Sequence, residues 1–362
     1  MVDLRRAAAI VGVHEHITRY APDKSEQQIQ GESIIKALED AGLEKKDVDG
    51  LFCASMSVRS SGLNLADYLN MYPKMVDNTT VGGGSFEFHL SHALNAIYAG
   101  RINCAVITYS SLARSGGISV GTGGVARFGH PRLDPSPDSF EELYGLTTVG
   151  LYAMIAQRHM EEFGTTSEQL GHVAVSTRAW ASKNPNAHKR DPMTIADHQA
   201  SRYVAEPLHL LDCCLVSDGG AAVVVTSVER AKDLNKPPVY IMGIGQHHIA
   251  WDLPQRPTLT TSGAKISGEM AFNMAGVGPQ DVDVCELYDC FTVVPMITLE
   301  DYGFCEKGEG GAFVENGTTG PGGSIPMNTS GGLLSESGMA GMQLIVEAVR
   351  QLRGEGGERQ VD

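Results

Sequence analysis

Three consecutive glycines, Gly82-Gly83-Gly84, stand immediately before Ser85 and a stretch with the apolar spacing of a helix. Backbone N–H groups in the first turn of a helix have no intrahelical partner and can bind an anion or a carbonyl oxygen. Glycine lets a ligand approach the backbone closely, so this arrangement could hold a phosphate or a thioester carbonyl. No lysine follows the glycines, which argues against a nucleotide-binding loop. Ser85 could act as a nucleophile only beside a strong general base.

Histidines and cysteines are the other side chains with reactive groups. His89 and His92 lie three residues apart on the expected helix, but no carboxylate at matching spacing accompanies them, so we interpret them as packing or surface residues. His247 and His248 lack a spaced third ligand. The seven cysteines include no C-x-x-C pair, and an odd number fits neither a disulfide framework nor a zinc cage. The sequence therefore predicts no metal site and buried, reduced thiols.

The composition excludes several classes of protein. A chain of 362 residues, 42% hydrophobic and 20% charged, can bury a large core. The net charge of -15, without clustered Lys and Arg, argues against a nucleic-acid partner, and it requires a locally positive pocket for any anionic substrate. We find neither an apolar run long enough for a membrane span nor a secretion signal, so we expect a cytoplasmic protein.

The elements that would position the glycine loop alternate between strands and helices. Short apolar runs indicate strands that are buried on both faces, and glycines end the helical stretches at Gly42 and Gly100. This order predicts a layered α/β unit. We expect strands at residues 7–13, 51–54, 104–109 and 212–225, and helices at residues 29–41 and 85–99.

The second half of the chain repeats this pattern. Ala41-Gly42-Leu43, followed by Asp47-Val48-Asp49, recurs at one constant offset as Ala275-Gly276-Val277, followed by Asp281-Val282-Asp283. An apolar run at residues 239–245 matches the first strand, and the agreement favours an internal duplication. We expect two α/β halves with the site between them. Their boundaries are residues 1–111 with 204–235 for the first half and residues 236–362 for the second.

A long insertion separates parts of the first half. Residues 112–203 contain a Gly- and Pro-rich loop at 115–137 and a helical stretch at 149–162. The segment Thr165-Thr166-Ser167-Glu168 has the pattern of a helix start. Insertions of this length often form lids or binding loops, so we interpret residues 112–203 as a loop or lid insertion.

Two segments of the second half are similar to a known family. Cys285-Glu286-Leu287-Tyr288-Asp289-Cys290-Phe291 precedes Asn328-Thr329-Ser330-Gly331-Gly332-Leu333-Leu334-Ser335. In order and separation they resemble the H-D-C-F and G-G-x-x-x-x-G-H-P segments of thiolases related to sterol carrier and lipid-transfer proteins. Residues 212–222 and 351–354 also resemble family segments, so the resemblance covers essentially the whole chain. It implies a thiolase fold with duplicated α-β-α-β-α halves and a coenzyme A thioester as substrate, and the second half is expected to lack the family's last strand.

The resemblance also shows which reactive groups are missing. The nucleophilic cysteine of the family aligns with Gly83, and a shift of one or two residues would place Gly84 or Ser85 there. The histidine of G-H-P aligns with Gly338, and that of H-D-C-F aligns with Tyr288, whose phenol can donate a hydrogen bond or, if its pKa is lowered, accept a proton. The alternative interpretation of Tyr288 is a buried aromatic in a strand-to-helix turn.

Carried over to this chain, the resemblance assigns three groups of site residues. The catalytic residues would be Tyr288, Ser85 and Asp289; the thioester-binding positions would be Gly83, Gly84 and Gly338; and the substrate-binding positions would be Gly331, Gly332, Ser337 and Met339. The nearest functional resemblance is to thiolase-like aldolases of steroid side-chain breakdown, which share Gly-Gly-x-x-Ser-Glu but carry a second tyrosine where Gly338 stands.

Three functions stay open at this point. The first is retro-aldol cleavage of a β-hydroxyacyl-CoA without a covalent enzyme intermediate, the second is acyl transfer by another nucleophile or by a partner's residues, and the third is binding of a lipid or acyl-CoA without catalysis. The resemblance further implies a homodimer and a small OB-fold partner protein with a zinc ribbon. It implies no covalently bound cofactor.

Overall fold

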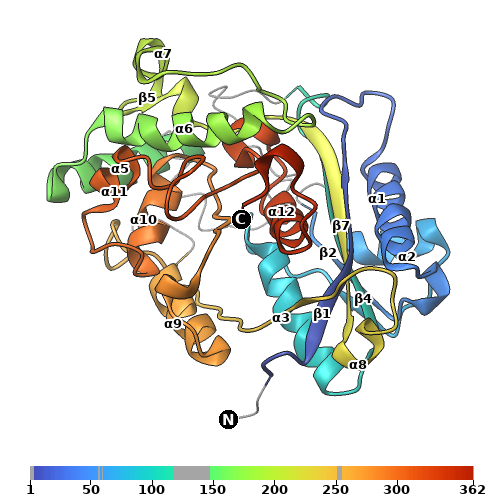
Figure 1. Cartoon of the computed structure of the whole chain (residues 1–362). Helices are drawn as coiled ribbons and strands as arrows, with labels where there is room; N and C mark the ends of the chain where they lie inside the picture. Colours follow the sequence, from blue (N-terminus) through green and yellow to red (C-terminus); the bar gives the residue numbers. More distant parts are fainter. Residues whose placement is uncertain (1–3, 56–57, 59, 118–146, 251–254, 362) are drawn as a thin grey trace.

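A six-stranded mixed sheet organises the first half of the chain (Figure 1). The computed structural model describes residues 4–55, 58, 60–117, 147–250 and 255–361. In the order β3-β2-β4-β7-β1-β8, β2 runs parallel to β3 and β4, whereas β7 runs antiparallel to β4 and β1. The strands of this sheet are β1 Ala8–His16, β2 Gly50–Cys53, β3 Met75–Asp77, β4 Cys104–Leu112, β7 Asp218–Ser227 and β8 Val239–Tyr240, and a separate pair is β5 Tyr203–Ala205 and β6 Leu208–His209.

Helices cover both faces of this sheet, with α1 and α2 on one side and α3 and α12 on the other (Figure 1). Alternate residues of β1 enter opposite layers, Ala9 on the α1 side and Ala8 on the α3 side, which explains the uninterrupted apolar runs. The predicted helices at residues 29–41 and 85–99 and the predicted strands at 7–13, 51–54 and 104–109 are thus confirmed to within a few residues, whereas the strand predicted at 212–225 begins only at Asp218. The α-helices are α1 Glu26–Ala41, α2 Ser61–Leu69, α3 Ser85–Tyr98, α5 Thr148–Phe163, α6 Ser167–Ser182, α7 Ile195–Ala200, α8 Val228–Ala231, α9 Ala264–Ala275, α10 Val293–Asp301, α11 Gly310–Glu315 and α12 Met342–Leu352.

The two halves repeat one packing contact as well as a stretch of sequence. Gly12 of β1 lies so close to α1 that a Cβ atom there would collide with the carbonyl oxygen of Ala37. In the second half, Gly243 lies equally close to the carbonyl oxygen of Ala271 in α9. Ala37 and Ala271 are related by the same offset as the sequence repeat, so the geometry supports an internal duplication.

The predicted strand at residues 239–245 is shorter in the structure. Only Val239–Tyr240 form β8, which pairs antiparallel with β1. Ile241 still donates its N–H to the carbonyl oxygen of Ala8 at 3.1 Å. The next residues pack against α9, as at Gly243, and have no assigned strand partner among the described residues.

Helices α5, α6 and α7 form the described part of the insertion. The predicted helix start near Thr166 is confirmed, because its side chain accepts a hydrogen bond from Gln169 N and the Gln169 side chain accepts one from Thr166 N. Helix α6 packs on the short π-helix η5, Gly332–Glu336, in the second half. The insertion therefore contacts the segment that carries the second family motif. Most of the predicted Gly- and Pro-rich loop, residues 118–137, lies outside the described residues.

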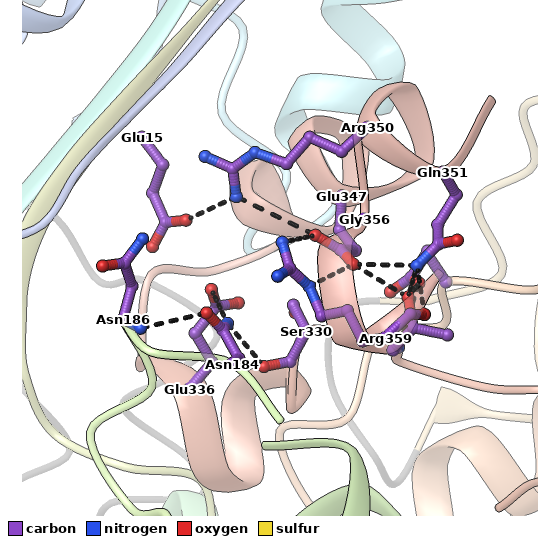
Figure 2. Close-up of polar contacts among 12 residues, drawn as sticks. Glu15, Asn184, Asn186, Ser330, Glu336, Glu347, Arg350, Gln351, Gly356 and Arg359 are labelled. Atoms are coloured by element: carbon purple, nitrogen blue, oxygen red, sulfur yellow. Dashed lines mark hydrogen bonds and ion pairs between the residues drawn. The ribbon is translucent and has the colours of Figure 1, made fainter. Parts of the chain in front are cut away.

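A buried polar network joins the insertion to both halves (Figure 2). Glu15 at the end of β1 bonds to Arg350 of α12 at 3.2 Å, and Arg359 binds Glu347 through two hydrogen bonds of 2.7 and 2.9 Å. Asn184, just after α6, donates to Glu336 of the π-helix at 2.9 Å. The network fixes the position of the loop that follows the π-helix.

The part of the chain that the structure describes contains neither a membrane-spanning helix nor a metal-binding cluster. None of its helices has both the length and the apolar character needed to cross a bilayer. Nor do any three or more His, Cys, Asp or Glu side chains gather there in a way that could hold a metal ion. All seven cysteines are free thiols.

Candidate active site

The phenol of Tyr288 lies directly over Gly83, at the start of α3. A Cβ atom built on Gly83 would collide with Cζ and with the hydroxyl oxygen of Tyr288. The aligned motif positions, which are about two hundred residues apart in the sequence, therefore meet in space. The tyrosine ring fills the volume into which a cysteine side chain at position 83 would project, so this arrangement holds a phenol where the family holds a thiol.

The hydroxyl group of Ser85 is used to shape the glycine turn. It donates to the carbonyl oxygen of Gly82 at 2.6 Å and accepts from Val81 N at 2.9 Å, and the residue is fully buried. No histidine or carboxylate bonds to it among the described residues. This geometry supports a structural role for Ser85 at the N-terminus of α3, whereas a nucleophile would need a neighbouring base.

The free backbone donors at this point come from the helix itself. Gly84 is the N-cap of α3, and the N–H groups of Gly84 and Phe86 make no hydrogen bond to another described residue. Such donors stabilise negative charge that develops on an oxygen in front of the helix. The predicted thioester-binding role of Gly84 thus has a geometric basis. Gly83 was predicted to bind the thioester as well, and in the structure it leaves room for the ring of Tyr288.

The loop after the π-helix returns to the start of α3. Gly341 N donates to the carbonyl oxygen of Gly83 at 3.1 Å. Gly338 lies against the chain segment before β7: its N–H donates to the Ser217 hydroxyl at 2.7 Å, and a Cβ atom there would collide with the carbonyl oxygen of Leu215. The N–H of Gly338 is therefore already occupied, and the backbone at this position accepts no side chain without moving.

The remaining predicted substrate-binding residues hold this loop. Met339 is fully buried in the core between the sheet, α3 and α12. Ser337 is also buried, its carbonyl oxygen accepts from the Gln343 side chain at 2.8 Å, and its hydroxyl has no partner among the described residues. Gly331 and Gly332 adopt the left-handed conformation at the entry to the π-helix, with φ of 107° and 53°.

Asp289 acts on the same loop from the next position in sequence. Its carboxylate is fully buried and accepts hydrogen bonds from Leu333 N at 2.8 Å and Leu334 N at 3.3 Å. Burial raises its pKa to about 6, although the backbone donors favour the ionised form. Both oxygens point at the π-helix, so the geometry supports a positioning role for Asp289 and gives it no contact with the space in front of α3.

The surroundings of Tyr288 favour its protonated form. Burial raises the pKa of the phenol well above its ordinary value, and the nearby thiols of Cys290 and Cys214 add to the increase. Those thiols are themselves poor nucleophiles, because burial raises the pKa of Cys214 to about 12 and raises that of Cys290 well above its usual range. At neutral pH this site contains a phenol that can donate a proton and no thiolate.

One titratable residue at the site was not identified from the sequence. Glu87 lies in the first turn of α3, and its Oε1 would be 2.9 Å from a Cβ atom built on Gly341. Loss of hydration raises its pKa to about 7. The available sequence signal was an acidic residue two positions after Ser85, on a helix that starts at the glycine turn.

By contrast, His89 is buried with Nε2 bonded to Thr79 O at 2.9 Å, and the predicted packing role is confirmed.

Comparison with known proteins places this geometry in a family. The sequence model described as Thiolase C-terminal domain-like matches residues 245–362. A steroid side-chain-cleaving aldolase of Thermomonospora curvata is 37% identical, over 96% of this chain and 90% of its own length. The chain belongs to the thiolase superfamily. The predicted resemblance and the predicted fold class are confirmed.

Two further members of the thiolase superfamily bear on the chemistry. An acetyl-CoA acetyltransferase of Methanothermobacter thermautotrophicus is 34% identical, over 99% of this chain and 94% of its own length. The solved structure titled Ltp2-ChsH2(DUF35) aldolase superposes with a TM-score of 0.89 at 35% identity, covering 99% of this chain and 93% of that one. Thiolase-superfamily relatives of this chain thus include both C–C lyases and acyltransferases.

Proposed function

We propose that the chain is a C–C lyase that cleaves β-hydroxyacyl-CoA thioesters of steroid or other lipid side chains by a retro-aldol reaction. One observation carries the proposal: the phenol of Tyr288 occupies the space above Gly83 that a nucleophilic side chain would need. Retro-aldol cleavage requires stabilisation of an enolate and proton transfer, but no covalent enzyme intermediate. The similarity to a steroid side-chain-cleaving aldolase supports this choice.

The site residues have separate roles in this reaction. The N–H groups at the start of α3 hold the thioester oxygen, which becomes the enolate oxygen when the bond between the α- and β-carbons breaks. The β-hydroxyl loses its proton and becomes a ketone or aldehyde carbonyl. Tyr288, protonated because its pKa is raised, donates a proton to the α-carbon of the enolate. The products are a carbonyl compound and a shorter acyl-CoA, which together contain all atoms of the substrate.

Acyl transfer is the second candidate, because one relative is an acetyl-CoA acetyltransferase. That reaction needs a nucleophile on the enzyme or on a partner. The hydroxyl of Ser85 donates a hydrogen bond to the carbonyl oxygen of Gly82, and no base lies beside it among the described residues. The thiol of Cys214 has its pKa raised to about 12. The site therefore supports retro-aldol cleavage better than acyl transfer. Binding without catalysis is the third candidate.

Two protein partners belong to the proposal. The similar solved structure is titled as a complex with a DUF35 protein, which supports an OB-fold partner of that kind for this chain. A second copy would pair at the edge strand β3, which has β2 on one side and no strand on the other among the described residues. Tyr72, next to β3, is 88% exposed in the single chain.

Free thiols throughout the chain support a reducing compartment such as the cytoplasm.

The test uses a panel of β-hydroxyacyl-CoA esters, with and without a DUF35-type partner, and follows CoA products by mass spectrometry. A ketone or aldehyde plus a shorter acyl-CoA, formed without free CoA, is the expected result. Tyr288→Phe should lose the activity. Product formation only when free CoA is added, or a stable acyl label on the protein, would support acyl transfer instead. Tight binding of every ester with no product would support the binding function.

A further inference from the structure

Glu87 brings a second proton-handling group to the start of α3. Its carboxyl group lies beside Gly341, and Gly341 N is bonded to the carbonyl oxygen of Gly83 at 3.1 Å. Tyr288 lies over the same Gly83. The carboxyl group and the phenol therefore border the same turn of backbone, one from α3 itself and one from the second half of the chain.

The environment of Glu87 differs from that of an ordinary surface glutamate. The residue is exposed as a whole, yet the protein around its carboxyl group removes enough water to raise the pKa to about 7. No basic side chain pairs with it among the described residues. The titratable group that feels its charge is Tyr302. An unpaired carboxylate that substrate can reach, with a pKa near neutrality, has the properties of a general base.

The base is needed because Tyr288 cannot serve as one at neutral pH. A phenol whose pKa lies well above its ordinary value is protonated at neutral pH, so it can donate a proton but cannot accept one. The resemblance to thiolase-like aldolases implies a second tyrosine at the position of Gly338. A Cβ atom there would collide with the carbonyl oxygen of Leu215, so the backbone leaves no space for such a side chain. The reaction proposed above therefore lacks a proton acceptor unless another residue supplies it.

We propose that Glu87 is the general base of the retro-aldol reaction and accepts the β-hydroxyl proton of the substrate, while Tyr288 protonates the enolate. The inference rests on the proposed function. The carboxylate takes the O–H proton, the electrons of the O–H bond form the carbonyl, and the electrons of the broken C–C bond form the enolate. Tyr288 gives its proton to the α-carbon, and the proton on Glu87 then returns to the phenolate. Substrate and products differ by no atom, and both side chains recover their starting states.

Glu87→Gln tests this role while keeping the shape of the side chain. We expect kcat to fall by about 10²–10⁴-fold, in a protein that unfolds at a temperature no lower than the wild type does. In the wild type, kcat/KM should rise with pH through an apparent pKa near 7, and Glu87→Gln should remove this dependence. Glu87→Asp, which keeps a carboxylate one carbon shorter, should recover part of the rate and restore a pH-dependent profile.

Glu168→Gln is the matched control, since Glu168 is an exposed glutamate in the first turn of α6, away from the site. It should leave the rate and the pH profile unchanged. A Glu87→Gln protein that cleaves the ester at the wild-type rate, or that keeps the wild-type pH profile, would overturn the role of Glu87 and leave the proposed function intact. A wild-type protein that cleaves no ester in the panel would overturn the proposed function and this role with it.

Discussion

The ring of Tyr288 fills the space into which any side chain at position 83 would have to project. The two residues therefore specify each other: glycine is needed at 83 because the tyrosine is present, and the tyrosine can take this position because residue 83 has no Cβ atom. In the proposed mechanism, the phenol at the N-terminus of α3 acts as a proton donor in the place where a thiolase would need a nucleophile.

Gly83→Ala should displace the phenol. We expect a loss of stability of about 1–3 kcal/mol from the overpacked contact and a decrease in cleavage of at least about tenfold, because proton donation depends on position. Denaturant unfolding and the CoA product assay measure the two effects. Gly150→Ala is the control, since a Cβ atom there would be 3.4 Å from its nearest neighbour and the site is helical. In a Tyr288→Ala background the cost of Gly83→Ala should shrink, and equal costs in the two backgrounds would contradict the proposed contact.

Gly338→Tyr should not supply the second tyrosine that the resemblance to thiolase-like aldolases implies at this position. The Cβ atom of the new side chain would collide with the carbonyl oxygen of Leu215. The collision would also disturb the hydrogen bond from Gly338 N to the Ser217 hydroxyl. We expect Gly338→Ala already to lower the free energy of unfolding by about 1–3 kcal/mol, and Gly338→Tyr to lower it at least as much without raising the rate. A stable and faster Gly338→Tyr protein would show that this loop adopts another backbone conformation during the reaction.

Stability should depend on pH through Glu87. Folding raises its pKa from an ordinary value of 4.5 to about 7, so the folded protein binds this proton more tightly than the unfolded chain does. The contribution to stability is complete below about pH 4.5 and is lost as the pH rises towards 7. Glu87→Gln should therefore lose less stability than the wild type between these two pH values. Thermal unfolding at several pH values, with Glu168→Gln as control, measures the difference, and parallel curves for all three proteins would contradict it.

The sequence predicted the scaffold well because its signals are local. Apolar alternation in the strands and the helix-ending glycines Gly42 and Gly276 depend only on neighbouring residues, and both glycines adopt the left-handed conformation in the structure. The family motifs also placed Tyr288 near Gly83. The role of Glu87 was not predictable in the same way, because its raised pKa arises from the protein packed around it. The contact of Gly338 with Leu215 likewise joins residues more than a hundred positions apart.

Two glutamates of the buried network should respond to the same substitution with very different losses of stability (Figure 2). Burial, and then the charge of Glu15, raise the pKa of Glu336 well above its usual range, whereas Glu347 binds Arg359 through both carboxylate oxygens. Glu336→Gln replaces a neutral acid with a neutral amide that can still accept from Asn184, which now donates to Glu336 at 2.9 Å.

We expect Glu336→Gln to change the free energy of unfolding at pH 7 by less than about 1 kcal/mol, since no charge is removed. Glu347→Gln should cost about 3–5 kcal/mol, because it leaves the guanidinium group of Arg359 buried without its counter-charge. Denaturant unfolding of the two variants in parallel is the measurement. If Glu336 is instead ionised in the folded protein, Glu336→Gln removes a charged partner from the nearby arginines, and its cost will be comparable to that of Glu347→Gln. Equal costs for the two variants would therefore contradict a neutral Glu336.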